Sequence, residues 1–172
     1  MRSHVLFISG RSGVGKSTAA LELHETLVEK DIRHAVIEGD YLDLAHPAPH
    51  LESPEEGLSE QNLSRMWQAY KSLGYSRLIY TNTVAVLSVE TLTAAMGDDP
   101  LVTAVLLRSS DEKAAERLDR RRLGAGDSAL PGRNAETARR LDDEAPDSVH
   151  RLETDGLSPP DVAAELLALT GW

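Results

Sequence analysis

The sequence predicts an α/β protein with a parallel sheet, and three observations lead to that class. Short apolar runs alternate along the chain with segments whose apolar residues recur at helical spacing. The first apolar run, Val5-Leu6-Phe7-Ile8, leads directly into a glycine-rich loop and then into a helical period. The 172 residues contain no internal repeat and no long linker, so we expect one domain over residues 1–172.

Five strands and six helices are expected, in alternating order. The strands are predicted at about 3–9, 35–38, 77–81, 101–107 and 149–152. The helices are predicted at about 17–30, 59–73, 89–96, 111–122, 134–144 and 159–169. Three prolines interrupt the segment 41–57, and glycine, serine and proline are frequent in 123–133. Both segments are therefore predicted to be loops, the first of them long enough to be functional or mobile.

The most specific motif is the loop from Gly10 to Thr18, which fits the pattern G-x-x-x-x-G-K-[ST] between a strand and a helix. Its glycines permit backbone angles that turn N–H groups inward around a phosphate, and the N-terminus of the next helix adds positive charge. Lys16 is expected to reach the β- and γ-phosphates of ATP, and the Ser17 hydroxyl to ligate Mg²⁺. The residues predicted to contact the nucleotide here are Gly10, Arg11, Ser12, Gly13, Val14, Gly15, Lys16, Ser17 and Thr18. A glycine-rich turn without a ligand is the disfavoured alternative, because every fixed position of the motif agrees.

Composition excludes several other classes of function. The chain has no cysteine, which excludes disulfides, thiolate catalysis and cysteine-based zinc sites. A formal net charge of -10 argues against general binding to nucleic acid. No apolar run approaches the ~20 residues that span a bilayer, and the first predicted strand begins too early to leave room for a signal peptide. We therefore expect a cytoplasmic protein, monomeric or homodimeric, with no membrane or nucleic-acid partner.

The signatures of several classes of nucleotide-binding protein are missing, namely Asn-Lys-x-Asp, Leu-Ser-Gly-Gly-Gln and a plain aspartate at the end of strand 77–81 or 101–107. What remains resembles the small P-loop kinases of metabolites, such as gluconate kinase, shikimate kinase and adenylyl sulfate kinase, and the related chloramphenicol phosphotransferases. The likeness rests on the segments 8–18, Ile37-Glu38-Gly39-Asp40, Glu116-Arg117-Leu118-x-x-Arg121 and Leu152-Glu153-Thr154-Asp155-Gly156. It implies a three-layer P-loop NTPase fold. The sheet would have five parallel strands in the order 2-3-1-4-5, with a helical, arginine-rich lid at about 117–140.

The resemblance also implies roles for single residues. Asp40, after strand 35–38, would accept the proton of the acceptor hydroxyl, orient that hydroxyl, or hold a water bound to Mg²⁺. The alternative is that Asp40 belongs to an ordinary turn at the end of a strand. Lys16, Asp40 and Arg121 are the predicted catalytic residues, and Asp155 is expected to contribute to nucleotide binding.

The arginines of the lid segment have two possible roles. Arg117 would pack against the adenine ring, and Arg121 would reach the phosphates. Arg133 or Arg139 could reach them from the far side of the loop. The alternative for each arginine is a solvated helix face that pairs with a neighbouring acid.

The acceptor is expected to bind at about 41–75. This segment contains five acids and only two bases. Because kinases with anionic acceptors need arginines at this position, we expect a neutral or cationic hydroxyl compound as the acceptor. Trp67 and Tyr70 either line this pocket or belong to the core, the latter being favoured. His46 and His50 lack a third ligand at metal spacing, so a metal site is not expected there.

The sequence thus predicts an ATP-dependent kinase that moves the γ-phosphoryl group of ATP to a hydroxyl of a small molecule. Two alternatives remain. One is a nucleotide or nucleoside kinase. The other is a nucleotide-binding switch ATPase without a small-molecule acceptor, in which the long loop 41–57 would be the moving element.

Overall fold

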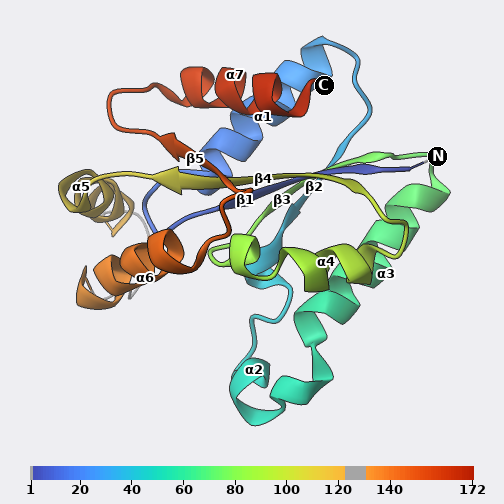
Figure 1. The fold of residues 1–172 in the computed structure, drawn as a ribbon, viewed down its shortest axis with the longest axis horizontal. Helices are drawn as coiled ribbons and strands as arrows, with labels where there is room; N and C mark the ends of the chain where they lie inside the picture. Colours follow the sequence, from blue (N-terminus) through green and yellow to red (C-terminus); the bar gives the residue numbers. More distant parts are fainter. Residues whose placement is uncertain (1, 123–130) are drawn as a thin grey trace.

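The computed structural model describes residues 2–122 and 131–172, and the side chains of residues 2–119 and 132–172. Within these ranges the centre is a sheet of five parallel strands in the order β2-β3-β1-β4-β5 (Figure 1). The strands are β1 (His4–Ser9), β2 (Ala35–Glu38), β3 (Arg77–Thr81), β4 (Leu101–Arg108) and β5 (His150–Glu153). The predicted α/β class and the predicted strand order are both confirmed.

Helices cover both faces of the sheet and make three layers (Figure 1). The main helices are α1 (Lys16–Glu29), α3 (Leu58–Ser72), α4 (Val89–Met96), α5 (Asp111–Arg122), α6 (Pro131–Glu144) and α7 (Pro159–Thr170). Helices α1 and α7 pack on one face, and α3, α4 and α6 on the other. Helix α5 follows β4 beyond the carboxyl end of the sheet. None of the helices in the described ranges is long and apolar enough to cross a membrane.

The position of β1 in the sheet explains why its sequence is a continuous apolar run. Successive side chains of a strand point to opposite faces, and both faces of this sheet are covered. Val5 and Phe7 therefore enter the core beneath α3 and α4, while Leu6 and Ile8 enter the core beneath α1 and α7. All four side chains are buried. The strand is fixed in position between β3 and β4, with the P-loop (residues 10–18) at its carboxyl end.

The two predicted loops contain more helix than expected. The segment 41–57 includes the short helix α2 (Pro49–Glu52) and a 3₁₀ turn at Pro54–Glu56. Helix α6 begins at Pro131 rather than at 134. Each of these elements starts with proline, whose fixed φ angle and missing N–H suit the first turn of a helix. Residues 123–130 lie outside the described part, so the lid at 117–140 remains a prediction.

Trp67 belongs to the core, as favoured from the sequence. Its side chain is fully buried on α3 in the cluster that also contains Phe7 and Tyr80. Tyr70 is partly buried and packs against the same cluster. Neither aromatic ring is among the residues that line the cavities described below.

Candidate active site

The candidate site lies at the carboxyl ends of the strands, where ligands bind in open parallel sheets. The P-loop joins β1 to α1, and its glycines at 10, 13 and 15 have φ values of 146°, 82° and 106°. A Cβ atom at Gly10 would lie 2.7 Å from the carbonyl oxygen of Leu107, and one at Gly13 would lie 2.6 Å from that of Ala114. At Gly15 a Cβ atom would meet no atom within 4 Å. The loop is therefore packed tightly on β4 and α5, and open at Gly15.

Lys16 and Asp40 come together at this edge of the sheet. The Lys16 side chain is buried, and its Nζ atom donates to the carbonyl oxygens of Gly10 at 2.8 Å and Arg11 at 3.4 Å. Asp40 lies in the short 3₁₀ turn Gly39–Tyr41 that follows β2. Its Oδ2 atom lies 4.0 Å from Nζ of Lys16. The fold brings these two predicted residues together, because β1 and β2 are parallel and end at the same edge of the sheet.

These residues line a single cavity of about 160 Å³. Its walls are Ser12, Gly13, Lys16, Ser17, Glu38, Asp40, Tyr41 and Leu118. The carboxylate of Glu38 accepts a hydrogen bond from the hydroxyl of Thr81 on the neighbouring strand. The cavity therefore combines one lysine, two carboxylate residues and two serines, a set of groups able to bind a phosphate together with a divalent cation.

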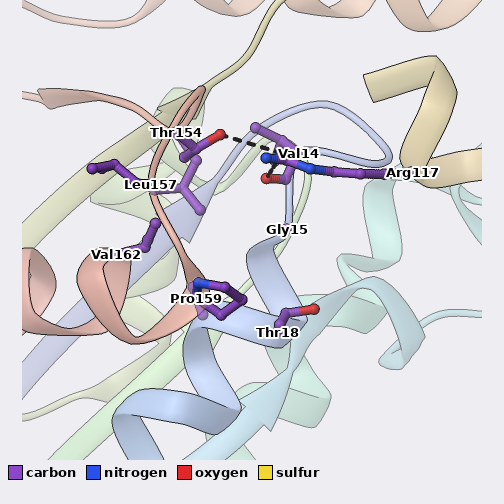
Figure 2. A pocket seen from close by; sticks show the side chains of 10 residues that line it. Val14, Gly15, Thr18, Arg117, Thr154, Leu157, Pro159 and Val162 are labelled. Carbon is purple, nitrogen blue, oxygen red and sulfur yellow. Dashed lines mark hydrogen bonds between the residues drawn. The ribbon is translucent and has the colours of Figure 1, made fainter. Parts of the chain in front are cut away.

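A second cavity, of about 230 Å³, lies on the other side of the start of α1 (Figure 2). It is lined by Val14, Gly15, Thr18, Ala19, Leu107, Arg117, Thr154, Leu157, Pro159 and Val162. Nη1 of Arg117 donates to the carbonyl oxygen of Val14 at 2.9 Å and to Oγ1 of Thr154 at 3.3 Å. A guanidinium group beside apolar side chains suits a flat purine ring, because such a ring stacks on both.

Asp155 does not line this cavity, although the sequence placed it in the nucleotide site. Its Oδ2 atom accepts the backbone N–H of Ser110 at 3.0 Å, just before α5. That hydrogen bond lowers the pKa of the Asp155 carboxyl. The neighbouring Thr154 provides the cavity wall instead. Thr154 lies inside the quoted segment 152–156 but was given no role, and Leu157, Pro159 and Val162, which follow that segment, were not predicted to line the site.

Arg11 is held by the start of α5. Its guanidinium group is buried and pairs with the exposed carboxylate of Asp111. The hydrogen bond from Arg11 lowers the pKa of Asp111. Arg11 lines neither of the two cavities, so its side chain stabilises the P-loop from outside.

The described part of the structure does not place the other predicted arginines, Arg121, Arg133 and Arg139, in the site. The side chain of Arg121 lies outside the described part of the chain. Arg133 is exposed, and the exposed Arg139 donates from Nε to the carbonyl oxygen of Ala135 on its own helix at 3.4 Å. A phosphate-binding role for these three residues stays a prediction.

The predicted acceptor segment contains a third cavity, of about 190 Å³. It is lined by Asp43, Pro49, His50, Ser53, Pro54, Gly57, Leu58, Ser59 and Glu60. The side chain of Tyr80 is buried, and its hydroxyl is close enough to Ser59 of this cavity to interact with it. Burial raises the pKa of Tyr80 to about 12, and the carboxylates of Asp40, Glu60 and Asp43 raise it as well.

His50 pairs with an acid and not with other histidines. Its Nδ1 atom lies 3.7 Å from Oδ2 of Asp43. Among residues 2–122 and 131–172, no group of three or more histidine, aspartate or glutamate side chains is placed to hold a metal ion.

Comparison with known proteins agrees with this geometry. The sequence model of the family described as Adenylylsulphate kinase matches residues 2–67, which include the P-loop and Asp40. No curated protein sequence matches the chain. Over its whole described length the chain has the fold of the small P-loop kinases, which confirms the resemblance seen in the sequence.

Three solved structures illustrate the likeness. The tunicamycin resistance protein of Deinococcus radiodurans is 22% identical, with a TM-score of 0.65 and coverage of 99% of this chain and 96% of that chain. A gluconokinase from Sinorhizobium meliloti 1021 is 20% identical, with a TM-score of 0.61 and coverage of 99% and 94%. The Mycobacterium tuberculosis APS kinase, solved with AMPPNP and APS, is 19% identical, with a TM-score of 0.60 and coverage of 99% and 99%.

Proposed function

We propose that the protein transfers the γ-phosphoryl group of ATP to a hydroxyl group of a small molecule. The observation that carries this proposal is the 4.0 Å approach of Lys16 Nζ and Asp40 Oδ2 in the wall of one cavity. An ammonium group and a carboxylate at the mouth of a P-loop are the two charges that phosphoryl transfer to a hydroxyl requires.

The residues present fit ATP and Mg²⁺. The open space at Gly15 and the first N–H groups of α1, which have no partner within the helix, suit a phosphate chain. The Ser17 hydroxyl and the carboxylates of Glu38 and Asp40 are the oxygen ligands that Mg²⁺ prefers, either directly or through water. The cavity beside Arg117 has the shape and chemistry for the adenine ring. When bound, magnesium ATP supplies a phosphoryl group whose negative charge the protein must balance.

Each protein group then has a defined task. Lys16 balances negative charge on the phosphates. Asp40 orients the acceptor hydroxyl and accepts its proton. Thr83 donates two hydrogen bonds to Asp40 and holds its carboxylate in one orientation. Positioning and charge balance together provide most of the catalysis in this class of reaction.

The acceptor is proposed to be neutral or cationic, such as a sugar, a nucleoside or an amino-bearing antibiotic. Asp43 and Glu60 line the third cavity, and their carboxylates, like that of Asp40, raise the pKa of the Tyr80 hydroxyl. Arginine and lysine are absent from the walls of this cavity. An anionic acceptor would be repelled there, whereas an ammonium group would be attracted.

A second candidate is a kinase with a nucleotide-like acceptor. The match of residues 2–67 to the Adenylylsulphate kinase family favours it. The acidic third cavity argues against it, because a phosphate or sulfate on the acceptor would find no arginine or lysine among the residues that line it.

The test is a panel of acceptors incubated with γ-labelled ATP and Mg²⁺. The panel should contain sugars, nucleosides, aminoglycosides, AMP and adenylyl sulfate, and the Asp40→Asn variant is the control for contaminating kinases. Label on a neutral or cationic compound, absent with the variant, supports the proposal. Label on AMP or adenylyl sulfate favours the second candidate. Slow ATP hydrolysis without any labelled acceptor would instead favour a switch ATPase and overturn the proposal.

A further inference from the structure

Asn134 contacts the P-loop at two points from a distant part of the chain. Its side chain is only 6% exposed and lies in the first turns of α6. The Oδ1 atom accepts the backbone N–H of Ser12 at 3.0 Å, and Nδ2 donates to the carbonyl oxygen of Ser12 at 3.0 Å. Only an amide side chain offers one acceptor and one donor in this arrangement, so the contact is specific to the residue type.

The second of these hydrogen bonds fixes the direction of a whole peptide group. A trans peptide is planar, and its C=O and N–H point in opposite directions. Because the Ser12 carbonyl points toward Asn134, the N–H of Gly13 must point away from Asn134. Gly13 lines the cavity of Lys16 and Asp40. The orientation of the Ser12–Gly13 peptide therefore determines whether an N–H group or a carbonyl oxygen faces the cavity.

Without a restraint this peptide could rotate easily. Gly13 has a φ of 82°, and a glycine accepts both signs of φ at little steric cost. After rotation a carbonyl oxygen would take the place of the N–H, and its negative end would repel a phosphate. Two residues further along the loop, the carbonyl of Val14 is held separately by Arg117 on α5. The Ser12–Gly13 peptide thus depends on Asn134.

We propose that Asn134 is a positioning residue that holds the Ser12–Gly13 peptide in the orientation needed to bind the β-phosphate of the nucleotide. This inference rests on the proposed function, since it assumes that the P-loop binds a nucleotide. Helix α6 would then take part in phosphate binding through the amide side chain of Asn134, and not through the arginines of the lid segment.

The test compares nucleotides that differ only in their phosphates. Affinities for adenosine, AMP and ADP are measured by calorimetry with Mg²⁺ for the wild type, Asn134→Leu and Asn134→Ala. Leucine keeps the volume and removes both hydrogen bonds, while alanine serves if leucine does not fit. Glu136→Ala, at an exposed position of the same helix, is the matched control. Thermal unfolding of each variant shows that it is folded.

We expect the affinity for ADP to fall about tenfold in both Asn134 variants, the effect of one or two lost hydrogen bonds. The affinities for adenosine and AMP should stay within about twofold of wild type, because the adenine cavity is unchanged. An unchanged ADP affinity, or an equal loss for AMP and ADP, would overturn the role of Asn134 and leave the proposed function intact. Wild-type protein that binds neither ADP nor ATP would overturn both.

Discussion

Thr83 holds the carboxylate of Asp40 with two hydrogen bonds, from its N–H to Oδ1 at 2.9 Å and from its hydroxyl to Oδ2 at 3.1 Å. Asp40 follows β2 and Thr83 follows β3, and these two strands are parallel neighbours in the sheet. The two hydrogen bonds therefore connect the carboxyl ends of neighbouring strands. The chain has Asn82 and Thr83 at the two positions that follow β3. Thr83, which follows β3, therefore orients the carboxylate of Asp40, which follows the neighbouring strand β2.

Replacing Asp40 by asparagine should reduce phosphoryl transfer at least ~100-fold, the usual effect of losing a general base. The affinity for ATP should stay close to wild type, because Lys16 and the P-loop amides are retained. Initial rates with the acceptor identified in the panel, together with calorimetry for ATP, provide the measurement. Asp147→Asn, at an exposed carboxylate of the surface, is the control. Turnover of Asp40→Asn near the wild-type rate would exclude Asp40 from the mechanism.

Replacing Arg117 by alanine should weaken ATP binding about tenfold, because its guanidinium group lines the second cavity and holds Val14. Binding of inorganic tripolyphosphate, which has no base, should change much less. Lys113→Ala is the matched control, since Lys113 lies on the same helix and pairs with Glu116 at the surface. An equal loss of affinity for ATP and tripolyphosphate would show that Arg117 acts on the phosphate site and not on the adenine site.

Replacing Gly39 by alanine should lower the free energy of unfolding by about 1–3 kcal/mol, the usual cost of overpacking a core. The new Cβ atom would lie 2.3 Å from Cζ of the buried Tyr80 ring. Urea unfolding provides the measurement, and Gly132→Ala, whose Cβ atom would meet no atom within 4 Å, is the control. In a Tyr80→Ala background the same substitution should cost less. An identical cost in both backgrounds would mean that the ring is not the obstacle.

The stability of the protein should fall as the pH drops below the ordinary histidine pKa of 6.5, in part because of His34. Burial is the main cause that lowers the pKa of His34, and the nearby His24 and Arg77 lower it further. The unfolded chain then binds more protons than the folded one between the lowered pKa and 6.5. The contribution of His34 to the free energy of unfolding is therefore complete above pH 6.5 and is lost as the pH falls through the lowered pKa.

Unfolding by urea between about pH 5 and 8 checks this, with His34→Gln as the comparison. The wild type should lose more stability on acidification than the variant does. Identical pH dependence in the two proteins would remove His34 as a source of acid sensitivity. The hydrogen bond of 2.7 Å between Nδ1 of His34 and the carbonyl oxygen of Ile32 keeps the ring in place in the folded protein.

The parts of the site that could be predicted are those encoded locally. The P-loop is a contiguous motif and was recognised from its own residues, whereas Asp40, at the end of a short apolar strand, was proposed from the family resemblance. The contacts of Thr83 with Asp40 and of Asn134 with Ser12 were not predicted, because the partners lie 43 and 122 residues apart and no local pattern marks such contacts. Thr154 lines the second cavity and its neighbour Asp155 does not, and a role of Asp155 in nucleotide binding stays a prediction.

The outer contacts of the P-loop have a consequence for synthesis of the chain. Arg11, Ser12 and Val14 are each supported from the C-terminal half, by Asp111, Asn134 and Arg117. On a ribosome the glycine-rich motif is made early, yet the residues that brace it appear about a hundred codons later. A nascent polypeptide that carries the motif alone therefore lacks these braces of the anion-binding loop, and nucleotide capture has to wait until Asn134 has been made.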